Sequence, residues 1–167
     1  MDSILRVEAG YLEVNNNIPQ NLLNSKLDSL EVIGHGIDIT ETRGIKELIE
    51  RFGESLEMRC FTVDERGTYE SGAKRIEYFA GRLAAKEAVL KALGKKRSEN
   101  ASWLDIEIRR LPTGRPSVVL YGKCQQIAVG LGITKWLVSI SHESSYAAAS
   151  VIALGRYDKQ SSLFSLR

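Results

Sequence analysis

The chain has 167 residues, of which 43% are hydrophobic and 26% are charged, and its formal net charge at pH 7 is +2. This length fits one domain with a real core, and the near balance of charge does not fit a strong nucleic-acid binder, which carries a marked basic excess. No run of about 18 apolar residues is present, so we predict no membrane-spanning helix. The first residues lack the basic head and apolar core of a signal peptide, and we expect a cytoplasmic protein.

The two cysteines, Cys60 and Cys124, lie far apart in the sequence and show no Cys-x-x-Cys or Cys/His spacing. This pattern excludes a cysteine-rich metal site and argues against a disulfide scaffold. We therefore expect two reduced thiols in or near the core.

The first half of the chain predicts an extension, a strand and two helices. Residues 1–30, where asparagines crowd around a proline, form the expected N-terminal extension. EVIGHGIDI (31–39) predicts a strand because it is rich in β-branched residues. GIKELIERFG (44–53) has apolar residues at helical spacing, and EYFAGRLAAKEAVLKALG (77–94) is rich in good helix formers. A glycine ends each of these helices.

The second half predicts short strands around one helix. In LDIEIRRL (104–111), Leu104, Ile106 and Ile108 face one way and the charged residues face the other. The remaining predicted elements are a turn at 112–116, a strand at 117–122, a short helix at 123–132 and a closing hairpin of residues 135–141 and 146–154. Helices interleaved with antiparallel hairpins predict an α+β domain over residues 31–157, followed by a C-terminal tail at 158–167.

The strongest helix carries Glu87 and Lys91, which are four positions apart and share one flank beside small alanines. The small residues leave room for a close approach to the helix. An exposed Glu–Lys pair at this spacing is common and is worth only about 0.2–0.5 kcal/mol. On the residues alone, an ordinary surface pair is therefore the favoured interpretation.

Asp38 is a single acid between Ile37 and Ile39 in the predicted first strand. A carboxylate in an apolar segment is costly to bury unless it is paired or binds a metal. The alternative is a carboxylate at a strand end, exposed to water or capping the helix that follows.

Taken together, these segments resemble the holo-acyl-carrier-protein synthases of the 4′-phosphopantetheinyl transferase superfamily. GHGIDITE resembles their opening motif G-x-G-x-D-[IL], and EYFAGRLAAKEAVLKALG resembles F-x-x-[KR]-x-[AS]-x-KEA-x-x-KA-x-G. PTGRPSVVLYG resembles their G-[KR]-P turn, and ISHESSYAAASVIA their closing segment. The likeness covers roughly residues 31–155. It implies the fold of that family, an antiparallel sheet packed against a long helix, and a homotrimer.

The resemblance implies an enzyme that moves 4′-phosphopantetheine from coenzyme A to a serine of an apo-acyl carrier protein and releases adenosine 3′,5′-bisphosphate. The nucleophile belongs to the partner, so no catalytic Ser–His or Cys–His pair is needed. A non-catalytic module that binds acyl carrier protein or coenzyme A stays open as the alternative. Nucleic-acid binding through the KKR and RR clusters is disfavoured by the low net charge.

The resemblance also assigns roles to individual residues. Asp38 and Glu87 are the expected Mg²⁺ ligands and form the catalytic group together with Lys91; Mg²⁺ favours carboxylate, phosphate and water oxygens, and lysine acts as a point charge on phosphate. Lys86 is expected to snorkel or to give indirect support. The expected coenzyme A contacts are Lys74, Arg75, Arg82, Lys91, Gly114, Arg115, Pro116 and His142. For Lys74, Arg75 and Arg82 the alternative is solvated surface charge. For residues 114–116 the alternative is a plain hairpin turn.

An acyl carrier protein is acidic, so a basic docking face is expected. Arg43 and Arg51, on the helix after the first motif, are the candidates. The family usually has an arginine where this chain has Gly44, so Arg43 is the candidate substitute. The base that removes the serine proton stays open between a metal-linked water, Asp64 and Glu65, and the sequence does not distinguish a fatty-acid from a polyketide carrier.

Overall fold

The computed structural model describes residues 30–67, 72–95 and 101–156. The predicted tail and nearly all of the predicted N-terminal extension lie outside these ranges, so the domain bounds of 31 and 157 stay predictions. The elements in chain order are β1 (Glu31–Glu41), α2 (Thr42–Phe52), α3 (Glu54–Cys60), α4 (Val63–Arg66), α5 (Ala73–Ala92), the 3₁₀ turn η1 (Trp103–Asp105), β2 (Ile106–Arg110), β3 (Pro116–Leu120), α6 (Gly122–Gly130), β4 (Ile133–His142) and β5 (Tyr146–Gly155). Within the described ranges, no helix is both long and apolar enough to span a bilayer.

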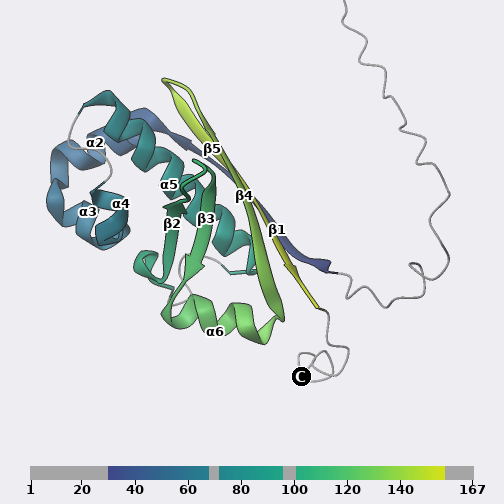
Figure 1. The fold of residues 1–167 in the computed structure, drawn as a ribbon. Helices are drawn as coiled ribbons and strands as arrows, with labels where there is room; N and C mark the ends of the chain where they lie inside the picture. The colour runs from purple at the N-terminus through teal and green to yellow at the C-terminus, as the bar shows by residue number, and fades with distance from the viewer. Residues whose placement is uncertain (1–29, 68–71, 96–100, 157–167) are drawn as a thin grey trace, which may run out of the picture.

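Two antiparallel sheets confirm the α+β prediction. The larger sheet has the strand order β1-β5-β4, and the smaller is the β2–β3 hairpin. In the larger sheet, Glu31 pairs with Gly155 at one end and Glu41 with Tyr146 at the other. Helix α5 packs along one face of this sheet, with the hairpin on its far flank and α2, α3 and α4 near its N-terminal end (Figure 1).

The approach of β1 to α5 is so close that it requires glycine. A Cβ atom built on Gly36 would lie 1.9 Å from the Ala88 carbonyl oxygen, and one on Gly34 would lie 2.0 Å from that of Ala92. Any side chain at either position would therefore push the strand off the helix. The room predicted beside the alanines of α5 is taken by the backbone of β1.

The core lies between α5 and its neighbours in two clusters. The larger joins the second half of α5 to β2, α6 and β5, and contains Ile106, Ile108, Cys124 and Val151. The smaller joins the start of α5 to α2 and the α3–α4 connection. Cys124 is buried and Cys60 is half-buried, so both thiols lie in or near the core as the sequence predicts.

Glycine ends the helices where the sequence places their ends. Gly53 follows α2 with φ of 53°, and its N–H donates to the Ile49 carbonyl at 2.8 Å. After α5, Gly94 has φ of 67°, its N–H donates to Lys91, and the N–H of Lys95 donates to Leu90. This pair of bonds is a Schellman motif, which satisfies carbonyls that the helix leaves unpaired.

The middle of the chain differs from the prediction in three ways. Leu104 does not join the buried face of β2, because it lies in η1 and is 40% exposed. Glu107, predicted on the face of the charged residues, is only 4% exposed, because its carboxylate contacts Arg109 and the Tyr121 hydroxyl. Helices α3 and α4 were not predicted; α4 has just four residues and is fixed by a capping box rather than by an apolar stripe.

Lys86 does not snorkel to the surface but lies in the interior. Its side chain and that of Glu65 are both 0% exposed, and the two form an ion pair of 2.8 Å. The ammonium group also donates to the carbonyls of Cys60 at 2.7 Å and Trp103 at 3.0 Å. Lysine has three N–H donors, so each has an acceptor. Burial lowers the pKa of Lys86, and the charge of Glu65 opposes that shift.

Both oxygens of the Glu65 carboxylate also accept hydrogen bonds from the backbone. Glu65 accepts from the backbone N–H of Thr62 at 2.9 Å and from that of Ile108 at 3.0 Å. The Lys86–Glu65 pair therefore ties α5 to α4, to the end of α3, to η1 and to β2. This is the indirect support that the sequence allowed for Lys86.

Candidate active site

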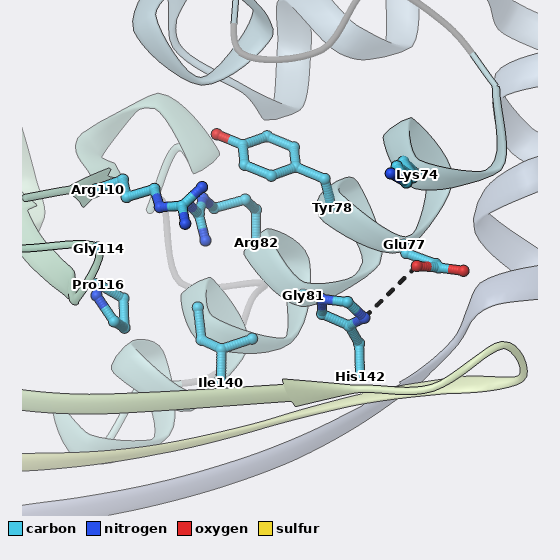
Figure 2. A pocket seen from close by; sticks show the side chains of 10 residues that line it. All are labelled: Lys74, Glu77, Tyr78, Gly81, Arg82, Arg110, Gly114, Pro116, Ile140 and His142. Atoms are coloured by element: carbon cyan, nitrogen blue, oxygen red, sulfur yellow. Dashed lines mark ion pairs between the residues drawn. The ribbon is translucent and has the colours of Figure 1, made fainter.

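A cavity of about 380 Å³ lies on the flank of α5 that faces β4 and the β2–β3 hairpin. Successive turns of α5 contribute side chains to one wall, the hairpin forms the second wall, and β4 forms the floor (Figure 2). The residues that line the cavity are Lys74, Glu77, Tyr78, Gly81, Arg82, Arg110, Gly114, Pro116, Ile140 and His142.

Arg82 is the most confined cation of this cavity. It is 7% exposed, its guanidinium carbon lies 4.4 Å from the centroid of the Tyr78 ring, and its buried Nε has no hydrogen-bond partner within the described residues. The side chain of Arg110 converges on it from the hairpin (Figure 2). Two guanidinium groups that converge in a cavity repel each other unless an anion lies between or beside them, so the arrangement favours a phosphate ligand.

Five of the predicted coenzyme A contacts line this cavity, from three separate parts of the chain. His142 Nδ1 lies 3.6 Å from Glu77 Oε2 at one end. Gly114 has φ of 84°, and its N–H donates to the Leu111 carbonyl at 2.8 Å, so the tight turn depends on glycine. The five residues are Lys74, Arg82, Gly114, Pro116 and His142.

Three predicted contacts are not brought to the cavity, and one of them, Lys91, pairs with Asp38 on the opposite flank of α5. Arg75 points to another part of the surface, where it pairs with Glu57 at 2.5 Å and lies 4.6 Å over the Phe79 ring. Arg115 is exposed at the tip of the hairpin and is not among the lining residues. Arg110 lines the cavity instead. Arg110 could have been predicted as a lining residue, because it ends the alternating strand just before the G-[KR]-P turn.

The opposite flank of α5 holds the predicted catalytic residues. Lys91 Nζ donates to Asp38 Oδ1 at 2.9 Å and to the Ile37 carbonyl at 2.8 Å. The side chain of Asp38 is 18% exposed and that of Lys91 is 51% exposed. The hydroxyl of Thr40 donates to Asp38 Oδ2 at 3.2 Å, so both carboxylate oxygens have a protein partner.

Glu87 belongs to the same flank. It is half-buried and lies one helical turn before Lys91. The close packing of β1 on α5 brings the two segments together, because Gly36 of β1 rests on Ala88, the residue after Glu87. Within the described ranges, no three His, Cys, Asp or Glu side chains are grouped as a metal site. The acids expected to bind a metal are therefore a pair, Asp38 and Glu87.

The cavity and the acid pair lie on different sides of one helix. Glu87 follows Tyr78 by nine positions and Lys91 follows Arg82 by nine. Nine residues are about two and a half helical turns, which rotates the second pair to the side opposite the first. In agreement, the cavity is lined by none of Asp38, Glu87 and Lys91.

The predicted docking arginines lie on α2. Arg43 donates to Glu47 at 2.9 Å in an exposed pair, and the guanidinium of Arg51 lies 5.0 Å over the Phe52 ring. This helix also exposes apolar side chains that were not predicted to be at the surface: Leu48 is 41% and Phe52 49% exposed.

The two side chains considered as the base differ in access. Glu65 is 1% exposed and both of its oxygens are engaged in the interior, so it is out of reach of a partner's serine. Asp64 is exposed on α4. It lines a second cavity of about 230 Å³, whose lining includes Glu65 and shares Tyr78 and Arg110 with the first cavity.

Residues 34–151 match the sequence profile of the 4′-phosphopantetheinyl transferase superfamily. The chain belongs to this superfamily. The matched range begins at the first glycine of β1 and ends within β5, so it contains the larger sheet, α5 and both flanks of the site.

Relatives within the superfamily share both the sequence and the fold. The holo-[acyl-carrier-protein] synthase of Koribacter versatilis is 44% identical over 72% of this chain and 97% of its own length. The Plasmodium yoelii acyl carrier protein synthase, solved with ADP bound, has a TM-score of 0.68 at 32% identity, covering 76% of this chain and 98% of that one. The Helicobacter pylori holo-[acyl-carrier-protein] synthase, solved in complex with coenzyme A, has a TM-score of 0.63 at 29% identity, covering 71% and 98%.

Proposed function

We propose that this chain is a holo-[acyl-carrier-protein] synthase, which transfers 4′-phosphopantetheine from coenzyme A to a serine of an apo-acyl carrier protein. The serine oxygen bonds to the phosphorus on the pantetheine side of the diphosphate, and the bond from that phosphorus to the bridging oxygen breaks. The products are the holo-carrier, adenosine 3′,5′-bisphosphate and the proton of the serine hydroxyl. The strongest support is that a cationic cavity lies on one flank of α5 and the acids Asp38 of β1 and Glu87 of α5 lie on the other, in a chain that is 44% identical to a named synthase.

The cavity on the β4 flank suits the phosphates of coenzyme A. Arg82 and Arg110 converge there, and Lys74 adds a third positive charge at the start of α5. Because guanidinium groups offer several fixed N–H donors, they hold phosphate oxygens in one orientation. The aromatic ring of Tyr78 and the apolar surface of Pro116 and Ile140 complete a mixed lining for a nucleotide.

The donor set on the other flank fits Mg²⁺. Two carboxylates from separate segments match the oxygen ligands that this ion prefers, with water and diphosphate oxygens to complete its coordination. When bound, the ion supplies Lewis-acid polarisation of the phosphoryl oxygen and offsets charge on the leaving oxygen. Asp38 and Glu87 would hold the ion, Thr40 orients the Asp38 carboxylate, and Lys91 would bring a positive charge to the diphosphate.

A complete site requires two copies of the chain, because the cavity and the acid pair point away from each other across α5. The free face of the β1-β5-β4 sheet supports such an assembly, since the described helices lie on the other side (Figure 1). Its exposed apolar residues include Ile37 at 57%, Ile39 at 65% and Leu137 at 45%. An apolar sheet face of this kind is typical of an interaction surface. The assembly is the homotrimer expected for the family, with each site shared between neighbours.

The acyl carrier protein docks on α2, where Arg51 offers a positive charge and Leu48 and Phe52 offer exposed apolar surface. Arg43 contributes less, because its guanidinium is already paired with Glu47. The balance of apolar and basic contacts fits an acidic partner that must bind, react and leave. We propose that the reaction takes place in the cytoplasm.

The direct test is mass spectrometry of an apo-acyl carrier protein incubated with this protein, coenzyme A and Mg²⁺. We expect the carrier to gain the mass of phosphopantetheine. The gain disappears with EDTA and with Glu87→Gln, and it persists with the control Glu31→Gln, an exposed acid at the start of β1. A mass gain that is indifferent to Glu87→Gln would contradict the proposed site, and binding of the carrier without any gain would favour a non-catalytic module.

Sharing of the site between copies has its own test. Arg82→Met and Glu87→Gln remove one half of the site each, and each variant alone is expected to be inactive. After denaturation and refolding together, mixed assemblies contain sites with both intact halves, so activity returns in part. If activity does not return although light scattering shows mixed assemblies, then the two halves act within one chain.

A further inference from the structure

Lys91 is hydrogen-bonded to the carboxylate that we propose as a metal ligand and to the neighbouring backbone carbonyl. Its ammonium group donates to Asp38 Oδ1 at 2.9 Å and to the Ile37 carbonyl at 2.8 Å. The two oxygen atoms together bind this cation as a small chelate. Both contacts are shorter than 3 Å and one acceptor is a carboxylate, so they are charge-assisted hydrogen bonds. The helix thus places a cation of its own on a proposed ligand of the magnesium ion.

An ammonium group and a divalent ion do not share a single carboxylate oxygen without cost. Mg²⁺ requires its ligand oxygens at about 2.0–2.1 Å, and a lysine hydrogen-bonded to the same oxygen adds direct charge repulsion. The other oxygen of Asp38 is engaged by Thr40, which limits how far the carboxylate can turn to present a free lone pair. Either the Lys91 ammonium leaves Asp38 or it opposes the binding of Mg²⁺ there.

Lys91 has the freedom to leave Asp38. Its side chain is 51% exposed, and two of its three N–H donors are held by the strand. A diphosphate bound beside the helix offers the ammonium a doubly charged alternative partner. The buried Lys86 in the same helix has no comparable freedom, because all three of its donors are enclosed in the interior.

We propose that Lys91 is an internal competitor of the divalent cation at Asp38, which keeps metal affinity low until a diphosphate draws the lysine away. Metal and coenzyme A then bind as a coupled pair: the metal frees Lys91 for the diphosphate, and the diphosphate frees Asp38 for the metal. This coupling is reciprocal by thermodynamic necessity. The inference rests on the proposed function, because it takes Asp38 to be a metal ligand.

The test measures Mn²⁺ binding by electron paramagnetic resonance, with the full chain and without coenzyme A or carrier. Mn²⁺ prefers the same oxygen ligands as Mg²⁺ and gives a direct signal for the free ion. Lys91→Met removes the charge and keeps an unbranched stem, and we expect it to bind Mn²⁺ about tenfold more tightly than the wild type. Lys91→Arg keeps the charge beside Asp38, and its affinity should stay near that of the wild type.

Two further variants distinguish a general charge effect and a wrongly assigned metal site from a failure of the competition itself. Lys123→Met removes a lysine charge from α6 and should leave Mn²⁺ affinity unchanged, which excludes a general effect of net charge. Asp38→Asn, introduced into Lys91→Met, should abolish the tighter binding. If Mn²⁺ binding does not depend on Asp38 at all, the proposed metal site is wrong and the inference falls with it.

If binding depends on Asp38 but Lys91→Met binds Mn²⁺ no more tightly than the wild type, only the competition is wrong and the proposed function stands. Weaker binding in Lys91→Met would show that the lysine orients Asp38 for the metal rather than competing with it. That result also overturns the inference.

Discussion

Helix α5 carries two lysine–carboxylate pairs that are nearly identical in distance and opposite in setting. Lys86–Glu65 spans 2.8 Å with both side chains 0% exposed, and Lys91–Asp38 spans 2.9 Å with the lysine half-exposed. The two lysines are five positions apart. In the first pair every donor of the lysine has a fixed acceptor in the interior, and in the second the lysine borders solvent.

The difference shows that burial, not distance, decides what an ion pair does. Bringing two charges out of water costs several kcal/mol, so an interior pair persists only when further hydrogen bonds satisfy it, as the carbonyls of Cys60 and Trp103 do for Lys86. Such a pair holds elements together and cannot change partners. An exposed pair contributes little to stability but can exchange its partner for a ligand.

The largest expected effect is that of Lys86→Met on stability. The substitution leaves the Glu65 carboxylate charged and without its cation in the interior, which typically lowers the free energy of unfolding by about 3–5 kcal/mol. Chemical denaturation monitored by circular dichroism measures the loss.

The double substitution Glu65→Leu with Lys86→Met removes both charges and should recover part of this loss. A double variant less stable than Lys86→Met alone would show that the hydrogen bonds of Glu65 to Thr62 and Ile108 matter more than the charge pairing.

The next effect is that of Gly36→Ala on the contact that brings Asp38 to the helix. The added methyl group would lie 1.9 Å from the Ala88 carbonyl oxygen, so β1 must shift, and overpacking of this kind costs about 1–3 kcal/mol. Transfer activity should fall with stability, because Asp38 moves with the strand. The matched control is Gly44→Ala in α2, where a Cβ meets no atom within 4 Å; it should raise stability by up to about 1 kcal/mol.

Arg82 is a third cation of α5, buried like Lys86 but aimed into the cavity. Arg82→Met should weaken coenzyme A binding by about 2 kcal/mol, the loss of one or two charge-assisted hydrogen bonds, which is ~30-fold in the dissociation constant. Isothermal titration calorimetry measures it. Arg115→Met, at the exposed tip of the same hairpin, is the control and should change affinity less than threefold. Equal effects of the two variants would place the phosphates at the tip rather than in the cavity.

The smallest expected effect is that of Lys91→Met on stability. An exposed ion pair contributes about 0–1 kcal/mol, so thermal unfolding should shift by only a few degrees. Transfer activity should nevertheless fall strongly, because the charge beside the diphosphate is lost. A destabilisation as large as that of Lys86→Met would mean that the two pairs have the same structural role.

Much of the fold was predictable because its signals are local. The alternation in β2, the glycines that end α2 and α5, and the two halves of the closing hairpin depend on neighbouring residues only. Helices α3 and α4 were missed because one has seven residues and the other four, too few for an apolar stripe to repeat.

The site was predictable in part. Asp38, Glu87 and Lys91 were named from motifs, and their placement on one flank follows from the glycines of β1 resting on α5. The direction of Arg75 was not predictable, because it depends on Glu57 of α3, a helix that the sequence did not reveal. The burial of Lys86 depends likewise on Glu65, which is distant in sequence and gives no periodic signal.

The pairing of Glu31 with Gly155 has a practical consequence. The described chain enters β1 and leaves β5 side by side, at the end of the sheet far from α2, which follows the opposite end of β1 (Figure 1). An affinity handle attached through either terminus therefore joins the described fold at the same end of the larger sheet. A protein captured on a sensor surface in this way presents α2 to the solution, so that carrier binding can be followed without blocking the proposed docking helix.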